Sequence, residues 1–220
     1  MKATRYYPIF ADLCGRRCVV VGGGGVAQRK TVALLGCGAR VAVVSPTLTH
    51  RLSTYVRQGR IRHLARRVRP TDLRGAWLVC AATDDQAVNK LVSQAARRLN
   101  IFANVVDQTP LCSFIAPAIV RRGPLTIAVS TGGASPSLAK VLRRDIERAV
   151  GTPHVTMLRL LRDLRGLAKD RLSDPRDRKR YFDRLLRGRV FALVREGKPA
   201  AARREALALL ERHARRDSRP

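Results

Sequence analysis

A glycine-rich segment near the N-terminus has the spacing of a phosphate-binding turn. Gly22-x-Gly24-x-x-Ala27 follows a β-branched run at residues 17–21 and precedes an apolar pattern typical of a helix. In that setting the first glycine permits a tight turn, the second lets a pyrophosphate approach the backbone, and the small third residue lets helix and strand pack closely. The N–H groups at the start of the helix would face the phosphates. The sequence therefore predicts a dinucleotide site, with a purely structural glycine turn as the alternative.

The residues expected to meet the ribose leave the choice of dinucleotide open. An Asp or Glu commonly binds the adenosine ribose about 20 residues after the fingerprint. Here the second expected strand ends in Ser45-Pro46-Thr47 instead. The hydroxyl of Ser45 or Thr47 can hydrogen-bond a ribose, but a hydroxyl discriminates poorly between NAD and NADP.

One carboxylate stands where it could take up a proton. Asp107 ends the apolar segment 101–106, and the carboxyl ends of parallel strands line the ligand crevice of an open α/β sheet. There it could accept a proton while a dinucleotide receives a hydride. A turn-forming Asp before Pro110 explains the residue equally well. Asp84 and Asp85, by contrast, precede a predicted helix, where an N-cap role explains at least one of them.

These residues need a sheet to bring them together, and the hydrophobic pattern predicts one. Apolar runs alternate with helical patterns up to Val106, which indicates an α/β fold with a mostly parallel sheet and right-handed crossovers. The expected strands are 17–21, 40–45, 60–64, 77–82 and 101–106, and the expected helices between them are 26–35, 48–58 and 86–99.

The pattern changes after this sheet. The extended segments 114–122 and 125–131 are separated only by Gly123-Pro124, too short a link for a parallel crossover, so an antiparallel hairpin is expected. A helix should follow from Ser135-Pro136 to Glu147. Further helices are expected from Pro153 onward, at 175–195 and at 199–213. This reading predicts three domains: a Rossmann-like one at 1–113, a hairpin-and-helix module at 114–150 and an all-helical region at 151–220.

The net charge of the chain and its distribution limit the classes of partner that it is expected to bind. The 220 residues contain 44 Lys and Arg against 16 Asp and Glu, a formal net charge of +28. The excess is spread along the chain, and no zinc finger, RNP-like aromatic strand or helix-turn-helix is recognisable, so nucleic acid is not an expected partner. The sequence has no apolar run of membrane-spanning length and no signal-peptide core, which predicts a cytoplasmic protein without a membrane partner. A substrate with many carboxylates would exploit the same positive field.

The cysteines predict reduced, mostly buried thiols and no bound metal. They are odd in number, scattered and mostly set in apolar runs, and they form no C-x-x-C pair. They are Cys14, Cys18, Cys37, Cys80 and Cys112.

Several motifs together resemble one family. The resemblance is carried by Tyr7-Pro8-Ile9-Phe10, by residues 19–30 around the glycine turn, by Ala81-Ala82-Thr83-Asp84-Asp85, by Asn104-Val105-Val106-Asp107, by Phe114-Ile115-x-Pro117 and by Ser130-Thr131-Gly132-Gly133-x-Ser135-Pro136. In this order they are similar to the precorrin-2 dehydrogenase/sirohydrochlorin ferrochelatase family, which forms the dehydrogenase and chelatase part of siroheme synthase. The resemblance runs from about Tyr7 to Glu147, and the remaining tail agrees only in being helical.

The resemblance implies an activity. It is the NAD-dependent oxidation of precorrin-2 to sirohydrochlorin, often followed by insertion of Fe²⁺ to give siroheme, with Asp107 as the catalytic residue for both reactions. Two alternatives remain: a dehydrogenase without chelatase activity, and a non-catalytic dinucleotide-sensing or nucleic-acid-binding protein.

The motifs and the resemblance together imply two sets of contacts. The expected cofactor contacts are Gly22, Gly24, Gly25, Val26, Ser45, Pro46, Thr47 and Thr83, and the expected tetrapyrrole contacts are Asn104, Arg121, Arg122, Ser130 and Lys140. Members of the family are homodimers in which the hairpin module and the helical region exchange contacts, so a homodimer is expected here.

The sequence departs from the family at two points. Some members have a phosphorylatable serine where this chain has Thr131, which leaves open whether that regulation carries over. Siroheme synthases also have a C-terminal methyltransferase domain, for which 220 residues leave no room. Methylation of uroporphyrinogen III is therefore expected from another protein.

Overall fold

The computed structural model describes residues 6–217 and divides into two compact units. The first unit contains the chain up to residue 116 together with Gly132–Ala134. The second contains Pro117–Thr131 and the chain from residue 135 onward. The expected three domains, with boundaries after residues 113 and 150, stay a prediction.

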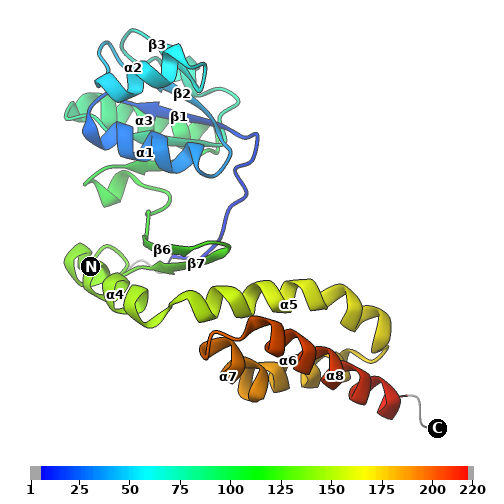
Figure 1. The fold of residues 1–220 in the computed structure, drawn as a ribbon. Helices are drawn as coiled ribbons and strands as arrows, with labels where there is room; N and C mark the ends of the chain where they lie inside the picture. Colours follow the sequence, from blue (N-terminus) through cyan, green and yellow to red (C-terminus); the bar gives the residue numbers. More distant parts are fainter. Residues whose placement is uncertain (1–5, 218–220) are drawn as a thin grey trace. The chain divides into compact units, whose positions relative to one another are not determined.

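The first unit is built on a five-stranded parallel sheet with helices on both faces (Figure 1). The strands are β1 (Arg17–Val21), β2 (Arg40–Val44), β3 (Ile61–Leu64), β4 (Leu78–Ala81) and β5 (Phe102–Val105). Their order in the sheet is β3-β2-β1-β4-β5. The chain therefore builds outward from β1 on one side and then returns to add β4 and β5 on the other. This is the order of the first five strands of a Rossmann fold, and the predicted fold class is confirmed.

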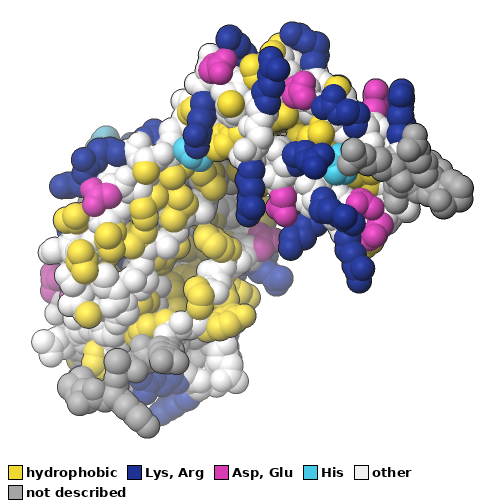
Figure 2. All heavy atoms as spheres, turned by 90° about the horizontal axis from the view of Figure 1, so that it is seen from below, with side chains coloured by type: hydrophobic (Ala, Val, Ile, Leu, Met, Phe, Trp, Pro, Cys, Tyr) yellow, Lys and Arg dark blue, Asp and Glu magenta, His cyan; other side chains and the backbone are white. Residues whose placement is uncertain are grey.

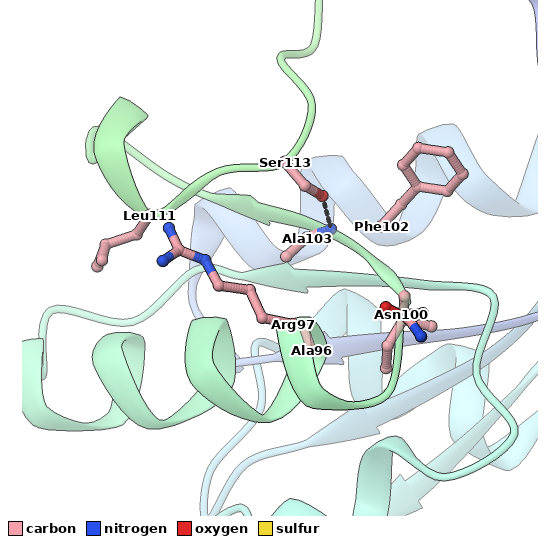
Figure 3. Close-up of a pocket in the computed structure, with 8 residues that line it drawn as sticks. Ala96, Arg97, Asn100, Phe102, Ala103, Leu111 and Ser113 are labelled. Atoms are coloured by element: carbon pink, nitrogen blue, oxygen red, sulfur yellow. Dashed lines mark hydrogen bonds between the residues drawn. The ribbon is translucent and has the colours of Figure 1, made fainter.

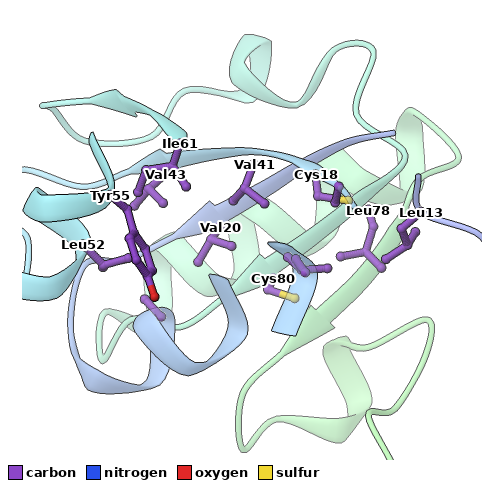
Figure 4. Close-up of a cluster of buried hydrophobic side chains, with 13 residues drawn as sticks. Leu13, Cys18, Val20, Val41, Val43, Leu52, Tyr55, Ile61, Leu78 and Cys80 are labelled. Carbon is purple, nitrogen blue, oxygen red and sulfur yellow. The ribbon is translucent and has the colours of Figure 1, made fainter. Parts of the chain in front are cut away.

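Strands buried on both faces explain the near-continuous apolar runs of the sequence. Alternate side chains of β1 point to opposite faces: Val20 joins one core cluster and Val19 the other. Helices α1 (Gly25–Leu35) and α2 (His50–Arg57) cover the Val20 face, where Leu52 packs against the sheet (Figure 4). Helix α3 (Gln86–Arg98) covers the Val19 face.

Two expected boundaries in this unit were wrong. Helix α2 begins at His50 rather than at Leu48, because the hydroxyl of Thr49 caps it by accepting a hydrogen bond from the Leu52 N–H at 3.3 Å. Residues 114–117 do not belong to a strand. Instead the chain turns back along β5 at this point: the Ser113 N–H donates to the Ala103 carbonyl at 2.8 Å.

Two short 3₁₀ helices, η1 (Pro70–Leu73) and η2 (Thr109–Leu111), lie in the connections. The first is held by Asp72. Both carboxylate oxygens of Asp72 accept from the Arg66 guanidinium, at 2.6 and 2.8 Å, and one also accepts from the Arg69 N–H at 2.7 Å. The Arg66 guanidinium holds the pKa of this carboxyl below its usual value. Asp72 therefore has a structural role.

The second unit begins with a β-hairpin followed by a helix, as predicted. Strands β6 (Ala118–Arg122) and β7 (Leu125–Val129) pair antiparallel. Helix α4 (Pro136–Ala149) contacts both strands, and the Ser135 hydroxyl caps it by accepting from the Leu138 N–H at 3.2 Å. The hydroxyl of Thr131 bonds both the N–H and the carbonyl of Ser135, which fixes the approach to the helix.

The rest of this unit is helical, with its own apolar core. Its helices are α5 (Thr152–Arg171), α6 (Pro175–Arg187), α7 (Arg189–Arg195) and α8 (Pro199–Asp217). Leu164, Tyr181 and Leu185 are fully buried in this core, and the Tyr181 hydroxyl donates to the Ala206 carbonyl at 3.1 Å. The single helix expected at 175–195 was wrong. Gly188 has an extended conformation that separates α6 from α7, and a Cβ there would lie 2.7 Å from the Arg184 carbonyl oxygen.

The surface carries both charge and apolar side chains. Figure 2 shows Lys and Arg interspersed with Asp and Glu, beside hydrophobic side chains on the same face. Among residues 6–217, no helix combines the length and the apolar character needed to cross a bilayer.

The thiols follow the prediction only in part. None of the five, which all lie within residues 6–217, forms a disulfide, and Cys18 and Cys80 are buried, which raises the pKa of each thiol to about 11. Cys14, however, is exposed, and Cys37 and Cys112 are half-buried. The expectation of buried thiols is therefore wrong for Cys14, because this residue precedes β1 rather than lying within the sheet.

Candidate active site

The candidate site lies at the carboxyl ends of β1 and β4. These strands are neighbours in the sheet although β2 and β3 come between them in sequence. The chain leaves β1 toward one side of the sheet and β4 toward the other, which creates the crevice in which open α/β sheets bind ligands. The Gly22 N–H donates to the Val44 carbonyl at 3.0 Å, and the Ala82 N–H donates to the Val21 carbonyl at 2.8 Å. The three strand ends are therefore locked together at the crevice.

The glycine turn at this edge is required by close backbone contacts. Gly22 has a φ of 114°, and a Cβ there would overlap the carbonyl oxygen of Ala82. A Cβ on Gly23 would overlap the carbonyl oxygen of Thr47. The fingerprint predicted the need for glycine at position 22 but not at position 23. The only sequence signal for Gly23 is the unbroken run of four glycines. Gly24 differs from both, because a Cβ there would meet no atom within 4 Å.

The turn leaves the start of α1 open to an anion. Gly24 is the N-cap residue and has no side chain to satisfy the first turn of the helix, and that turn contains no acidic residue. The first helical hydrogen bond runs from the Gln28 N–H to the Gly24 carbonyl at 2.9 Å, so the N–H groups of Gly25 and Val26 have no acceptor within the helix. These N–H groups, the positive end of the helix and the open space at Gly24 fit the diphosphate of a dinucleotide.

The predicted ribose contacts lie directly beside this turn. Ser45 is buried, whereas Pro46 and Thr47 are exposed. The Thr49 N–H donates to the Gly23 carbonyl at 2.9 Å, which joins the loop after β2 to the glycine turn. The structure therefore brings residues 45–47 and 22–26 together at one edge.

Thr83 lies at the end of β4 in a loop that two side chains hold in place. Its hydroxyl accepts from the Asp85 N–H at 3.1 Å, and its carbonyl accepts from the Asn89 amide at 3.0 Å. Asp85 also accepts from the N–H groups of Ala87 and Val88, which confirms the predicted N-cap. Asn89 was missed by the sequence reasoning, although a polar residue on the apolar face of α3 was an available signal. It is 2 % exposed.

Asp107 lies just beyond β5 at the same edge. Thr83 and Asp107 each come two residues after a pair of facing residues, Ala81 and Val105. Asp107 is exposed and has a φ of 58°, a conformation that Asp adopts more readily than most residues. Within residues 6–217 its carboxylate has no hydrogen bond or ion pair. The residue thus does form a turn, and its free carboxylate is also able to act as a base.

The predicted substrate residues are divided between the two units. Asn104 is buried in the first unit, where its amide contacts Lys30 and the Phe114 carbonyl. The others lie exposed in the second unit, on β6, just after β7, and on α4. They are Arg121, Arg122, Ser130 and Lys140.

A pocket of about 320 Å³ lies elsewhere, near the amino end of β5 (Figure 3). Its lining comes from the end of α3, the start of β5 and the segment that turns back along it. The Ser113 hydroxyl accepts from the Ala103 N–H across it at 2.8 Å. Since the candidate site lies at the opposite ends of the strands, this pocket is not the dinucleotide crevice.

The sheet order and the open glycine turn define the class of the protein: it is a Rossmann-like dinucleotide-binding protein. Three family models match the chain in succession. Residues 9–118 match a model described as putative NAD(P)-binding, residues 122–149 match the sirohaem biosynthesis protein central model, and residues 156–210 match the sirohaem synthase dimerisation region. The chain belongs to the family that these putative NAD(P)-binding and sirohaem synthase models describe, and its first unit is a nicotinamide-dinucleotide-binding domain.

Individual relatives agree with this assignment. The chain is 43 % identical over 202 residues to the siroheme synthase of Nitrosospira multiformis, and 44 % identical over 196 residues to that of Methylobacillus flagellatus. These matches cover 90 % and 89 % of this chain but 43 % and 42 % of the relatives; the chain spans less than half their length. A solved structure described as SirC, precorrin-2 dehydrogenase, matches with a TM-score of 0.76 and 27 % identity, over 94 % of this chain and 100 % of that one.

Proposed function

We propose that this protein oxidises precorrin-2 to sirohydrochlorin with NAD as the oxidant. The observation that carries the proposal is the free carboxylate of Asp107, which lies at the same edge of the sheet as the open glycine turn. The likeness to SirC, precorrin-2 dehydrogenase, supports it, because that likeness covers the whole of SirC and nearly all of this chain.

The residues at the glycine turn are proposed to hold the cofactor. The N–H groups of Gly25 and Val26 would bind the diphosphate, and Gly22 and Gly24 would leave room for it. Ser45, Pro46 and Thr47 would contact the adenosine ribose, and Thr83 would border the nicotinamide half. When bound, NAD supplies the acceptor for a hydride. NAD rather than NADP is proposed as this acceptor.

Asp107 is proposed to manage the protons of the reaction. Oxidation removes one hydride and one proton from precorrin-2, and the carboxylate would accept the proton. The same group would serve chelation: insertion of Fe²⁺ into sirohydrochlorin releases two pyrrolic protons, which need an acceptor. We therefore include ferrochelatase activity in the proposal, as a second reaction at the same carboxylate.

The substrate and the assembly complete the proposal. Tetrapyrroles of this class carry several carboxylate arms, and a basic protein attracts and neutralises them. Asn104, Arg121, Arg122, Ser130 and Lys140 are proposed to contact these arms. The working form is proposed to be a homodimer, in line with the match of residues 156–210 to a dimerisation region. We expect the reaction to take place in the cytoplasm, which supplies the dinucleotide.

The direct test is turnover. Purified protein, precorrin-2 and NAD should give sirohydrochlorin and NADH in equal amounts, followed by absorbance, and NAD should give a higher kcat/KM than NADP. Formation of siroheme from sirohydrochlorin and Fe²⁺ without NAD tests the chelatase part separately. Absence of turnover with authentic precorrin-2 and either dinucleotide would rule the dehydrogenase out. A salt-dependent shift of DNA without turnover would favour a nucleic-acid-binding protein instead.

A further inference from the structure

Lys30 occupies an unusual place in the first unit. Helix α1 packs on the sheet through Ala27, Thr31 and Leu34, all buried. Lys30 leaves the helix beside this row and reaches across to β5, where its ammonium donates to the Asn104 side-chain oxygen at 2.9 Å. The side chain is half-buried.

No opposite charge accompanies this ammonium. Among residues 6–217 Lys30 forms no ion pair: Asp72 binds Arg66, Asp85 caps α3, and Asp107, just beyond β5, has no ion-pair partner. Removing an ammonium from water without a counter-charge is costly. A neutral amide offsets only part of that cost, so the position is better suited to a state in which an anion is bound.

The neighbours of Lys30 hold the ammonium in a fixed direction. The Asn104 amide nitrogen donates to the Phe114 carbonyl at 3.3 Å and lies 3.7 Å from the Cys112 sulfur. The sulfur itself accepts from the Val105 N–H at 3.1 Å. This network turns the amide oxygen toward Lys30. An ammonium has three donors, so two remain for another acceptor.

The position along the sheet indicates which acceptor this is. Asn104 faces Cys80 across β4 and β5, one residue before the last residue of each strand. Asp107 follows three residues later, so about 10 Å of chain separates the two positions at roughly 3.3 Å per residue. The diphosphate contacts lie at the start of α1 instead, one turn before Lys30. The ammonium is thus on the β4–β5 side, where the reacting end of the site is proposed to lie.

We propose that Lys30 is a specificity-determining residue that binds a carboxylate arm of the tetrapyrrole. This inference rests on the proposed function and extends it, since it adds a cation from the first unit to the substrate contacts. Asn104 would then act as a positioning residue for Lys30. The anion is an acid arm of the macrocycle rather than the dinucleotide diphosphate.

The test uses the full chain with Lys30→Met and Lys30→Arg. Lys90→Met is the matched control. Lys90 is an exposed lysine on α3 of the same unit, and its substitution removes the same charge. Steady-state kinetics give KM separately for precorrin-2 and for NAD, and fluorescence quenching gives the Kd of sirohydrochlorin without turnover. Lys30→Met should raise the KM for precorrin-2 and this Kd by about 10- to 100-fold. The KM for NAD and the melting temperature should stay at the Lys90→Met values, and Lys30→Arg should recover part of the loss.

Three outcomes would overturn the inference. If Lys30→Met bound sirohydrochlorin as well as Lys90→Met does, the ammonium would have no role in recognition. The inference would also fail if Lys30→Met weakened the binding of NAD and of sirohydrochlorin equally and lowered the melting temperature, because Lys30 would then only support the sheet. The inference would also be contradicted if the wild-type protein bound no sirohydrochlorin. Failure of the proposed function differs from these: it appears as wild-type protein without turnover, whatever Lys30 does.

Discussion

At the scale of the residue, the proposed chemistry depends on a single side chain. Asp107 combines three properties: a place just beyond β5, an exposed carboxylate, and no partner among residues 6–217 that would hold or neutralise its charge. A carboxylate in a structural ion pair, such as Asp72 with Arg66, would lose that ion pair when it accepts a proton. The folded protein would then be destabilised. Asp107 has no such bond to break.

Asp107→Asn should separate chemistry from binding. The amide has nearly the same shape and tolerates the same positive φ, but it cannot accept the proton. We expect kcat for precorrin-2 oxidation to fall at least 100-fold, in the range usual for loss of a general base. The affinity for NAD, measured by calorimetry, should change less than about twofold. Asp163→Asn, an exposed acid on α5, is the control, and a variant at position 107 that kept most of the wild-type rate would refute the proton-acceptor role.

At the scale of the element, the β1–α1 turn combines two different glycine requirements. Gly22 and Gly23 are needed because other backbone segments touch them, whereas Gly24 borders open space. Glycine is thus needed at positions 22 and 23 for folding, and at position 24 to leave room for the ligand. The structure thus separates positions that look equivalent in a run of four glycines.

Gly23→Ala should therefore impair stability, and Gly24→Ala should impair NAD binding. A methyl group at position 23 must push the Thr47 backbone away, which should lower the free energy of unfolding by about 2 kcal/mol. Gly24 has ordinary dihedrals, φ −81° and ψ −171°, so alanine there should change stability by less than about 0.5 kcal/mol. It should weaken NAD binding, because the methyl group occupies the approach of the diphosphate. Urea unfolding and calorimetry check both, and equal stability of the two variants would contradict the assignment.

At the scale of the whole molecule, an apolar surface on the second unit needs a partner. Leu138, Val141 and Leu142 share one face of α4 and are 50 %, 50 % and 40 % exposed. Contiguous exposed apolar side chains mark interaction surfaces. The match of residues 156–210 in the same unit to a dimerisation region supports a second copy of the chain as the partner.

Val141→Asp should weaken the proposed homodimer. A charge in the middle of the α4 face would have to be buried without a partner on assembly, so the mass measured by light scattering should shift from dimer toward the 24.4 kDa monomer at low micromolar concentration. Leu91→Asp, a similarly exposed leucine on α3 of the first unit, should leave the mass unchanged. A dimer of undiminished stability in Val141→Asp would exclude α4 from the interface.

Local patterns were sufficient to predict most of the elements. The apolar runs predicted all five parallel strands, a helix was expected from Ser135-Pro136, and an N-cap was expected at Asp84 or Asp85, of which Asp85 caps α3. The errors lie where a local signal competes with packing. The helix expected at 175–195 contains Gly188, whose extended backbone ends α6.

The sequence by itself determined the fold class, the glycine turn and the place of Asp107. The periodicity of strands and helices and the positions where they end depend on residues close together in the sequence. Tertiary structure alone decided what those residues touch. The Lys30–Asn104 hydrogen bond joins residues 74 positions apart, and the contact of Gly23 with Thr47 depends on how two loops meet. Such contacts arise from the order of strands in the sheet, and no local pattern encodes them.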